Sequence, residues 1–269
     1  MATIGLYSAN VPNPTLILTN PALILFFLPL PDNSKFHQPK KRVLLFVFGF
    51  QHPTTSNDDY IRHDAITDYI FNLAQNQYGK EVTKEDIFYY VYGFLHSPQY
   101  RETFAADLKK MLPRLPLVED PSDFWSFSQA GRKLAYLHLN YETVPPHSAV
   151  TEIATTNLDD AFDFYKVQKM KFPAKDQKDT IIYNSRITLQ NIPPEAYEYV
   201  VNGKSAIDWI IERYQITTHA DSGITNNPNH WAEETNNPRY IIDLLHSVIN
   251  LSVQTVQIVN SLPKITFKE

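Results

Sequence analysis

The chain has 269 residues and a mass of 31.1 kDa, enough for one large domain or two small ones. With 43% hydrophobic and 20% charged residues it is not a disordered chain, and without cysteine it has no disulfide, thiolate metal site or cysteine nucleophile. The formal net charge is −5, so any nucleic-acid role must depend on a local basic patch.

The first eighty residues are β-rich by pattern. Short apolar runs at residues 15–18, 22–28 and 43–50, bounded by Pro and Asn, predict buried strands, and residues 64–77 have the apolar spacing of an amphipathic helix. The most apolar stretch, residues 22–30, contains a proline and is too short to span a bilayer. Because no basic signal-peptide segment precedes it, we expect a cytoplasmic protein with no membrane partner.

From Thr83 onward the pattern becomes helical. Residues 83–86 predict a helix start, residues 100–111 a second helix stopped by Pro113, and Ser122 the start of a third. The apolar residues in 141–160 follow neither helical nor strand periodicity, which predicts a loop.

The rest of the chain mixes both kinds of element. Strands are expected at residues 162–172 and 180–189, the latter with a possible tight hairpin at residues 184–185. Pro193 and Pro194 suit a helix start, Gly203 a helix end, and residues 207–214 and 239–261 two further helices. The expected fold is therefore α+β: a β-rich part at residues 1–82, then a mostly helical body at 83–269 with a small antiparallel sheet or hairpin, together one compact unit.

Known catalytic patterns are missing from the sequence. It contains no HExxH, no GxSxG and no glycine-rich phosphate loop, and Asp107 and Lys109 fall within a helix, where a nuclease site would need neighbouring strands. Near Pro193 the sequence resembles the Asn-Pro-Pro-aromatic pattern of amino-methyltransferases, but it does not match that pattern. We therefore expect no catalytic residue, no metal and no cofactor in this chain.

Two segments suggest binding. Residues 166–178 carry five lysines against Asp176, which makes +4 in an acidic protein; a lysine-protected strand edge is the simpler interpretation and a phosphate-binding stripe the alternative. Residues 215–237 form a long polar stretch with Asn226, Asn227 and Asn229, whose amides can pair with adenine edges, although Asn is also a common turn residue.

Several stretches resemble the C-terminal specificity (target-recognition) domain of type ISP restriction-modification enzymes. The similarity covers residues 83–263 in the family's order and is carried by residues 85–93, 96–98, 100–102, 104–114, 130–134, 137–142, 182–184, 192–197, 201–206, 209, 212–214, 222–224 and 238–240.

This resemblance implies a part of a longer polypeptide. In that family a nuclease, a helicase-like ATPase motor and an N6-adenine methyltransferase precede the domain, which reads double-stranded DNA and presents the target adenine. The chain would then be an excised or separately encoded recognition domain, without catalysis of its own, whose partners are double-stranded DNA and the methyltransferase and motor regions.

Candidate DNA-binding residues follow from side-chain chemistry, because Lys and Arg suit phosphates while Gln, Asn, His and Arg suit base edges. We expect the segments shared across the family to be part of the scaffold or to contact the DNA backbone. They include the segments with Lys204, residues 222–224 and Arg239. The full set of candidates is Lys40, Lys41, Arg42, Gln51, His52, Lys169, Lys171, Lys175, Lys178, Lys204, Asn226, Asn227 and Arg239.

Two other functions stay open. A protein-interaction module that docks onto a partner subunit would show an extensive exposed apolar patch without a basic face. A hydrolase with an unfamiliar site would show a pocket of clustered carboxylates or histidines with shifted pKa values.

Overall fold

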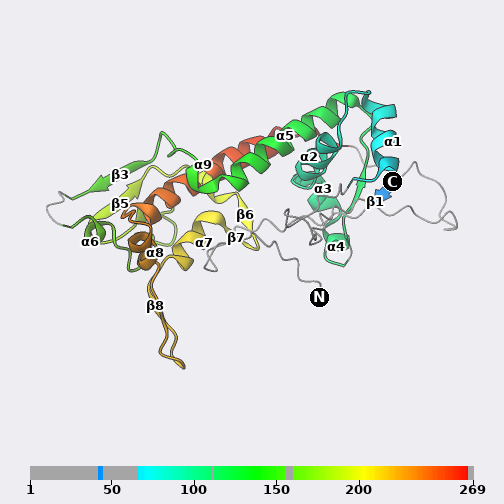
Figure 1. The fold of residues 1–269 in the computed structure, drawn as a ribbon. Coiled ribbons are helices and arrows are strands. Elements are labelled where there is room, and N and C mark those ends of the chain that lie inside the picture. The colour runs from blue at the N-terminus through cyan, green and yellow to red at the C-terminus, as the bar shows by residue number, and fades with distance from the viewer. Residues whose placement is uncertain (1–41, 45–65, 111, 156–159, 266–269) are drawn as a thin grey trace, which may run out of the picture. The chain divides into compact units, whose positions relative to one another are not determined.

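A computed structural model describes the chain over residues 42–44, 66–110, 112–155 and 160–265 (Figure 1). Helices and small antiparallel sheets alternate along it, which confirms the expected α+β class. The chain divides into two compact units. One contains the described residues up to Tyr136 and from Ile258 onward, and the other contains Leu137–Gln257.

The first unit is mainly helical. Its two short strands pair antiparallel, with Val43 opposite Leu115. Its elements are β1 (Arg42–Leu44), α1 (Asp68–Tyr78), α2 (Lys84–Phe94), α3 (Pro98–Thr103), α4 (Ala105–Leu108), β2 (Arg114–Pro116) and most of α5 (Pro121–Leu139).

Local sequence signals explain where these helices begin. Thr67 caps α1, and Thr83 caps α2 in a reciprocal capping box with Asp86, so Asp performs the role that Glu or Gln usually has. Both predicted helices are confirmed. The single helix predicted across residues 100–111 is wrong, because Phe104 leaves the helical conformation and divides it into α3 and α4.

Aromatic rings fill the core of this unit. The Tyr78 and Phe124 rings stack at 4.2 Å, and Tyr90, Phe94 and Phe127 surround them, all at most 4% exposed.

Two glycines bring α2 and α5 into backbone contact. A Cβ at Gly131 would lie 1.9 Å from the carbonyl oxygen of Tyr89, and one at Gly93 would lie 2.2 Å from that of Phe127. Only a residue without a side chain fits either position.

The second unit combines a small sheet with hairpins and helices. Its elements are η1 (Tyr141–Thr143), β3 (Thr151–Ala154), α6 (Ala161–Tyr165), β4 (Ile181–Ile182), β5 (Ile187–Gln190), η2 (Pro194–Tyr197), β6 (Val200–Val201), β7 (Lys204–Ser205), α7 (Ala206–Arg213), β8 (Thr217–Thr218), β9 (Thr225–Asn226), α8 (Asn229–Glu234) and most of α9 (Tyr240–Asn260).

The largest sheet has the strand order β3-β5-β4, all antiparallel. The predicted hairpin between β4 and β5 is confirmed, and the Asn184 side chain forms its turn by accepting hydrogen bonds from the backbone N–H groups of Arg186 and Ile187. The loop predicted at residues 141–160 is partly wrong, because β3 pairs there with β5.

Two further local predictions are wrong. Residues 162–172 were expected to be a strand, but Asp160 caps the helix α6 by accepting from the backbone N–H of Phe162. Gly203 was expected at a helix end, but it lies at φ +85° in the tight turn that joins β6 to β7.

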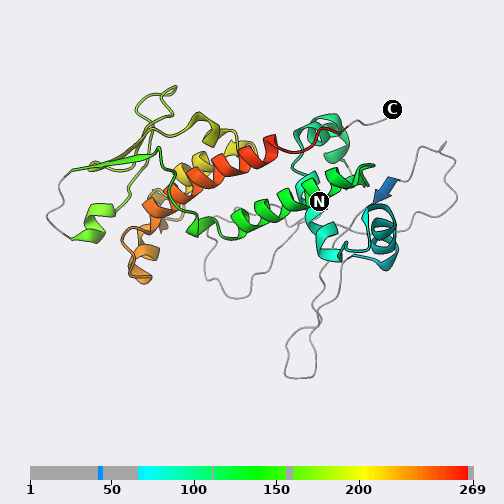
Figure 2. The same cartoon turned by 90° about the horizontal axis from the view of Figure 1, so that it is seen from above.

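The helix α9, coloured orange to red in Figure 2, lines the core of the second unit and confirms the helix predicted at residues 239–261. By length and composition alone it could cross a membrane, but 72% of its most apolar window is buried. Burial in the core is therefore a sufficient reason for its apolar character.

The β-rich N-terminal part lies mostly outside the described residues, including the strand predictions at residues 15–18 and 22–28. The boundary predicted between residues 82 and 83 falls inside the first unit, where Val82 and Ile87 share one core. That residues 1–82 and 83–269 form one compact unit stays a prediction.

Candidate nucleic-acid interface

The lysine-rich segment, residues 166–178, is fixed to the segments on both sides of the β8–β9 hairpin. The buried Asn229, at the start of α8, accepts a hydrogen bond from the Val167 N–H at 2.9 Å and donates one to the Val167 carbonyl at 2.8 Å. Just before β8, the Ile216 N–H donates to the Gln168 carbonyl at 2.9 Å. These bonds place the first lysines of the segment, Lys166 and Lys169, at the base of the hairpin.

Most lysines of this segment present free charges to solvent. Lys169, Lys171 and Lys175 are exposed, as is Lys166. Within the part of the chain that the structure describes, none of these four forms an ion pair. Free, exposed ammonium groups are suitable for contacts with phosphates.

Lys178 has a different environment. Its Nζ lies 3.8 Å from a carboxylate oxygen of Asp208, and over the rings of Tyr197 and Phe172 at 5.1 and 5.5 Å. The ammonium group is therefore held by contacts inside the protein, although its side chain remains 46% exposed.

Lys204 also has partners within the chain. Its Nζ pairs with the Glu212 carboxylate and lies 4.9 Å from the Trp209 ring centre. These contacts connect β7 to α7, as expected of a scaffold residue.

Arg239 belongs to a polar cluster in the second unit. Its guanidinium donates to both carboxylate oxygens of Glu152, at 3.2 and 2.9 Å, and also to Asp243 and the Tyr165 hydroxyl. It lies over the Tyr165 ring at 4.7 Å as well. The structure therefore gives this candidate residue a scaffold role, connecting β3, α6 and α9.

The cluster controls the charge of its members. Burial opposes the charge of Glu152, but the hydrogen bonds and charge of Arg239, with His246, outweigh it and lower the pKa of the carboxyl. Burial also lowers the pKa of His246, whose Nε2 lies 3.4 Å from Glu152. The histidine is therefore neutral at pH 7 and the carboxylate charged.

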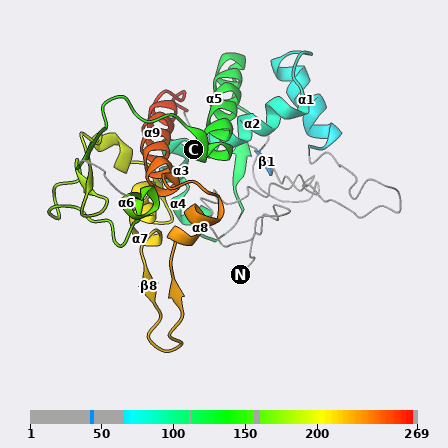
Figure 3. The same ribbon diagram turned by 60° about the vertical axis from the view of Figure 1, so that its left-hand side comes forward.

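The β8–β9 hairpin extends away from the neighbouring helices α7 and α8 (Figure 3). Thr217 pairs with Asn226 and Thr218 with Thr225, and every residue from 217 to 226 is exposed. Gly223, at φ +67°, forms the turn near the tip, and Ile224 beside it is 70% exposed. The sequence predicted only a polar stretch here, although Asp-Ser-Gly between two Thr-containing pairs is a hairpin signal.

The three asparagines of this region have different surroundings. Asn229 is buried and structural, and the Asn227 side chain accepts from the Asn229 backbone N–H and side-chain amide at 3.1 and 2.7 Å. Asn226 is exposed on β9, and within the described ranges its side-chain amide has no hydrogen-bond partner. Of the three, only Asn226 is exposed.

Five candidate residues cannot be assigned a side-chain environment. Lys40, Lys41, Gln51 and His52 lie outside the described residues. For Arg42 the structure gives only the backbone, in β1 opposite Pro116.

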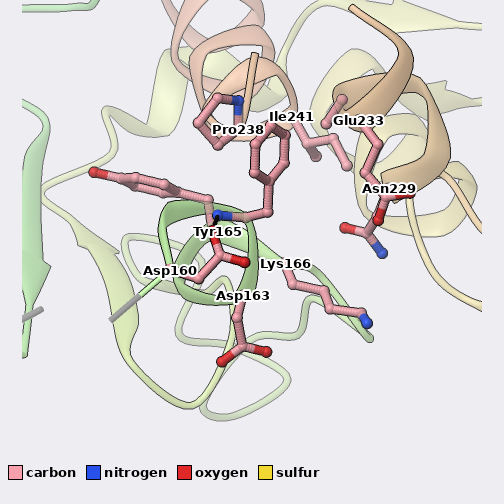
Figure 4. Close-up of a pocket in the computed structure, with 10 residues that line it drawn as sticks. Asp160, Asp163, Tyr165, Lys166, Asn229, Glu233, Pro238 and Ile241 are labelled. Atoms are coloured by element: carbon pink, nitrogen blue, oxygen red, sulfur yellow. Dashed lines mark hydrogen bonds between the residues drawn. The ribbon is translucent and has the colours of Figure 1, made fainter. Parts of the chain in front are cut away.

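A small pocket of about 180 Å³ lies beside the lysine segment (Figure 4). Asp160, Asp163 and Glu233 line it together with Lys166, so carboxylates outnumber the single cation. This charge is unsuitable for a phosphate. The described residues contain no group of three or more His, Asp or Glu side chains arranged to hold a metal ion.

Comparison with known proteins identifies the family. The model of the Type ISP C-terminal specificity domain matches residues 15–244. No match is found among the curated proteins.

Three solved structures are similar. A nuclease-deletion mutant of the Type ISP restriction-modification enzyme LlaGI, in complex with a DNA substrate mimic, is 44% identical over 76% of this chain, with a TM-score of 0.62. The ATP-dependent Type ISP enzyme LlaBIII, bound to DNA, is 38% identical over 84%, with a TM-score of 0.69. DrdV in a DNA complex is 31% identical over 84%, with a TM-score of 0.65.

The chain spans 14% of the length of the LlaGI and LlaBIII chains and 22% of the DrdV chain. The family model covers most of the sequence, in agreement with the resemblance found in the sequence. The chain belongs to the family of Type ISP C-terminal specificity domains.

Proposed function

We propose that this chain recognises a specific double-stranded DNA sequence within a cytoplasmic Type ISP restriction-modification enzyme and presents the target adenine to the methyltransferase region. In this role it has no catalysis or cofactor of its own, and its partners are DNA and the methyltransferase and motor regions. The observation that carries the proposal is the family match, together with similar structures that are bound to DNA.

The distribution of charge supports the proposal. The protein has a net charge of −5, yet residues 166–178 concentrate five lysines, most of them exposed and unpaired within the described region. A local cationic segment on an acidic domain supplies phosphate contacts without binding every polyanion equally. The rest of the phosphate contacts would come from the other regions of the enzyme.

Selection from randomised DNA tests the proposal. The chain is incubated at about 50 mM salt, where phosphate contacts are strong, with a pool of random duplexes, and the retained DNA is sequenced. Enrichment of one motif of several base pairs is the expected result. Retention without a motif would contradict recognition by this chain alone, and no retention would favour a protein-interaction module.

Substitutions of single lysines test where the phosphates bind. Lys169→Ala should weaken binding to all duplexes alike and reduce the slope of log K against log salt by about one. Lys204→Ala is the matched control, because Lys204 already pairs with Glu212 and should change the slope less. Equal effects of the two substitutions would argue against a phosphate contact at the lysine segment.

A further inference from the structure

Among the residues that the structure describes, the β8–β9 hairpin contributes no side chain to the buried core of its unit. Every residue from 217 to 226 is exposed, whereas the segments on both sides are fixed, through Ile216 to Gln168 and through Asn229 to Val167. A ribbon that is fixed at its base and free along its length is positioned to contact something outside the unit. Since none of these ten residues is buried, core packing does not explain their sequence.

The two faces of the hairpin differ in what they offer a ligand. On one face the hydroxyls of Thr218 and Thr225 lie 2.9 Å apart and bond to each other. The other face carries Thr217 and, directly opposite, Asn226. In the described part of the chain, neither of these two side chains has a hydrogen-bond partner.

The size of the ribbon fits a DNA groove. The major groove, about 12 Å wide and about 8.5 Å deep, admits a two-stranded β-ribbon, and three extended residues already span roughly 10 Å. Between residues 217 and 226 the hairpin carries no lysine or arginine, and Asp221 is its one acidic residue. Phosphate contacts would therefore come from Lys166 and Lys169 at its base, which leaves the polar side chains of the hairpin for the bases.

We infer that the β8–β9 hairpin enters the major groove and reads bases, with the Asn226 amide on an adenine edge and Ile224 against the methyl group of a thymine. This assignment depends on the proposed DNA-recognition function and specifies which element performs it. The Asn side chain donates from its NH2 group to adenine N7 and accepts from the N6 amino group at its Oδ1, a bidentate pair that no other base matches as well. An exposed isoleucine beside a glycine turn supplies the apolar contact that a thymine methyl requires.

The sharpest test is a substitution that should change the preferred base from adenine to cytosine. Asn226→Asp keeps the size of the side chain but removes its amide donor, and a carboxylate accepts from the amino group of cytosine. In the selection from random duplexes, we expect one position of the motif to change from adenine to cytosine, with a change in relative enrichment on the order of tenfold and the other positions unchanged. Ile224→Ser should relax the preference for thymine at a neighbouring position and leave binding to unrelated duplexes unaltered.

The control variant is Asn236→Asp. It places the same charge on an exposed residue after α8, and it should leave the motif as it is. Denaturation midpoints of all variants verify that each one is folded.

The outcomes separate this inference from the proposed function. If the wild-type chain selects a motif and Asn226→Asp selects the same one, the hairpin does not read bases, while the proposed function stands. If Asn226→Asp loses affinity equally for every duplex and Asn236→Asp does not, the hairpin contacts the DNA backbone. That result would also overturn base reading. If the wild-type chain selects no motif, recognition by this chain and its hairpin fail together.

Discussion

Arg239 holds both carboxylate oxygens of Glu152, at 3.2 and 2.9 Å, across 87 residues of sequence. The sequence offered Arg239 as a possible DNA contact. In the structure its planar fork connects the start of α9 to β3 within the second unit.

Arg239→Lys should therefore destabilise the fold and leave the DNA motif unchanged. A lysine cannot form the paired contact, and with Arg239 partly exposed we expect a loss of about 2 kcal/mol in urea unfolding. Arg186→Lys is the control, because Arg186 contacts the exposed Asp163 at 3.1 Å and should cost under about 1 kcal/mol. A changed motif in Arg239→Lys, with unchanged stability, would return Arg239 to the DNA interface.

Gly131→Ala should strongly destabilise the first unit. The added Cβ would lie 1.9 Å from the Tyr89 carbonyl oxygen, so α2 and α5 would have to separate, at a cost of about 3 kcal/mol. Gly223→Ala meets no atom within 4 Å and bears only the strain of its φ of +67°, so about 1 kcal/mol is expected. Thermal unfolding midpoints that rank the two variants in the opposite order would contradict this account of the helix contact.

Asn229→Ala should loosen the base of the hairpin. It leaves the buried N–H and carbonyl of Val167 without their partners, which we expect to cost about 3 kcal/mol and to reduce motif enrichment. Asn237→Ala removes one exposed contact to the Arg239 N–H and should cost about 1 kcal/mol or less. The prediction fails if hydrogen exchange at Val167 stays as slow in Asn229→Ala as in the wild-type protein.

Asp86 should make the stability of the first unit sensitive to acid. Burial opposes its charge, but hydrogen bonds from Thr83 and the Arg132 side chain, at 2.9 Å, outweigh burial and lower the pKa of the carboxyl. A group with a lowered pKa stabilises the fold above its ordinary pKa, about 3.9, and this contribution is lost as the pH falls through the lowered value.

Asp86→Asn should therefore lose stability at pH 7 and depend less on pH below about 5 than the wild-type protein. Urea midpoints at a series of pH values measure this difference. Asp221→Asn, which removes an exposed carboxylate from the hairpin, controls for the loss of one negative charge at pH 7. Parallel curves for the wild-type protein and Asp86→Asn would disprove the role of Asp86.

Elements with strong local signals were predictable from the sequence alone. The capping residue Thr83, the Asn184 turn and the apolar spacing of α9 are each local in the chain, so their patterns survive folding. The family could also be identified, because its motifs are contiguous stretches of sequence.

Contacts between distant segments were decided only by the tertiary structure. Residues 162–172 were predicted as a strand, yet Asn229 fixes the backbone there through Val167, 62 residues away. Folding also gave Arg239 and Lys204 carboxylate partners within the protein. It left the Asn226 side chain exposed, without a hydrogen-bond partner in the described region. A sequence specifies which side chains can bind DNA, but a charge or amide is available to a ligand only when folding does not bring it to a partner inside the protein.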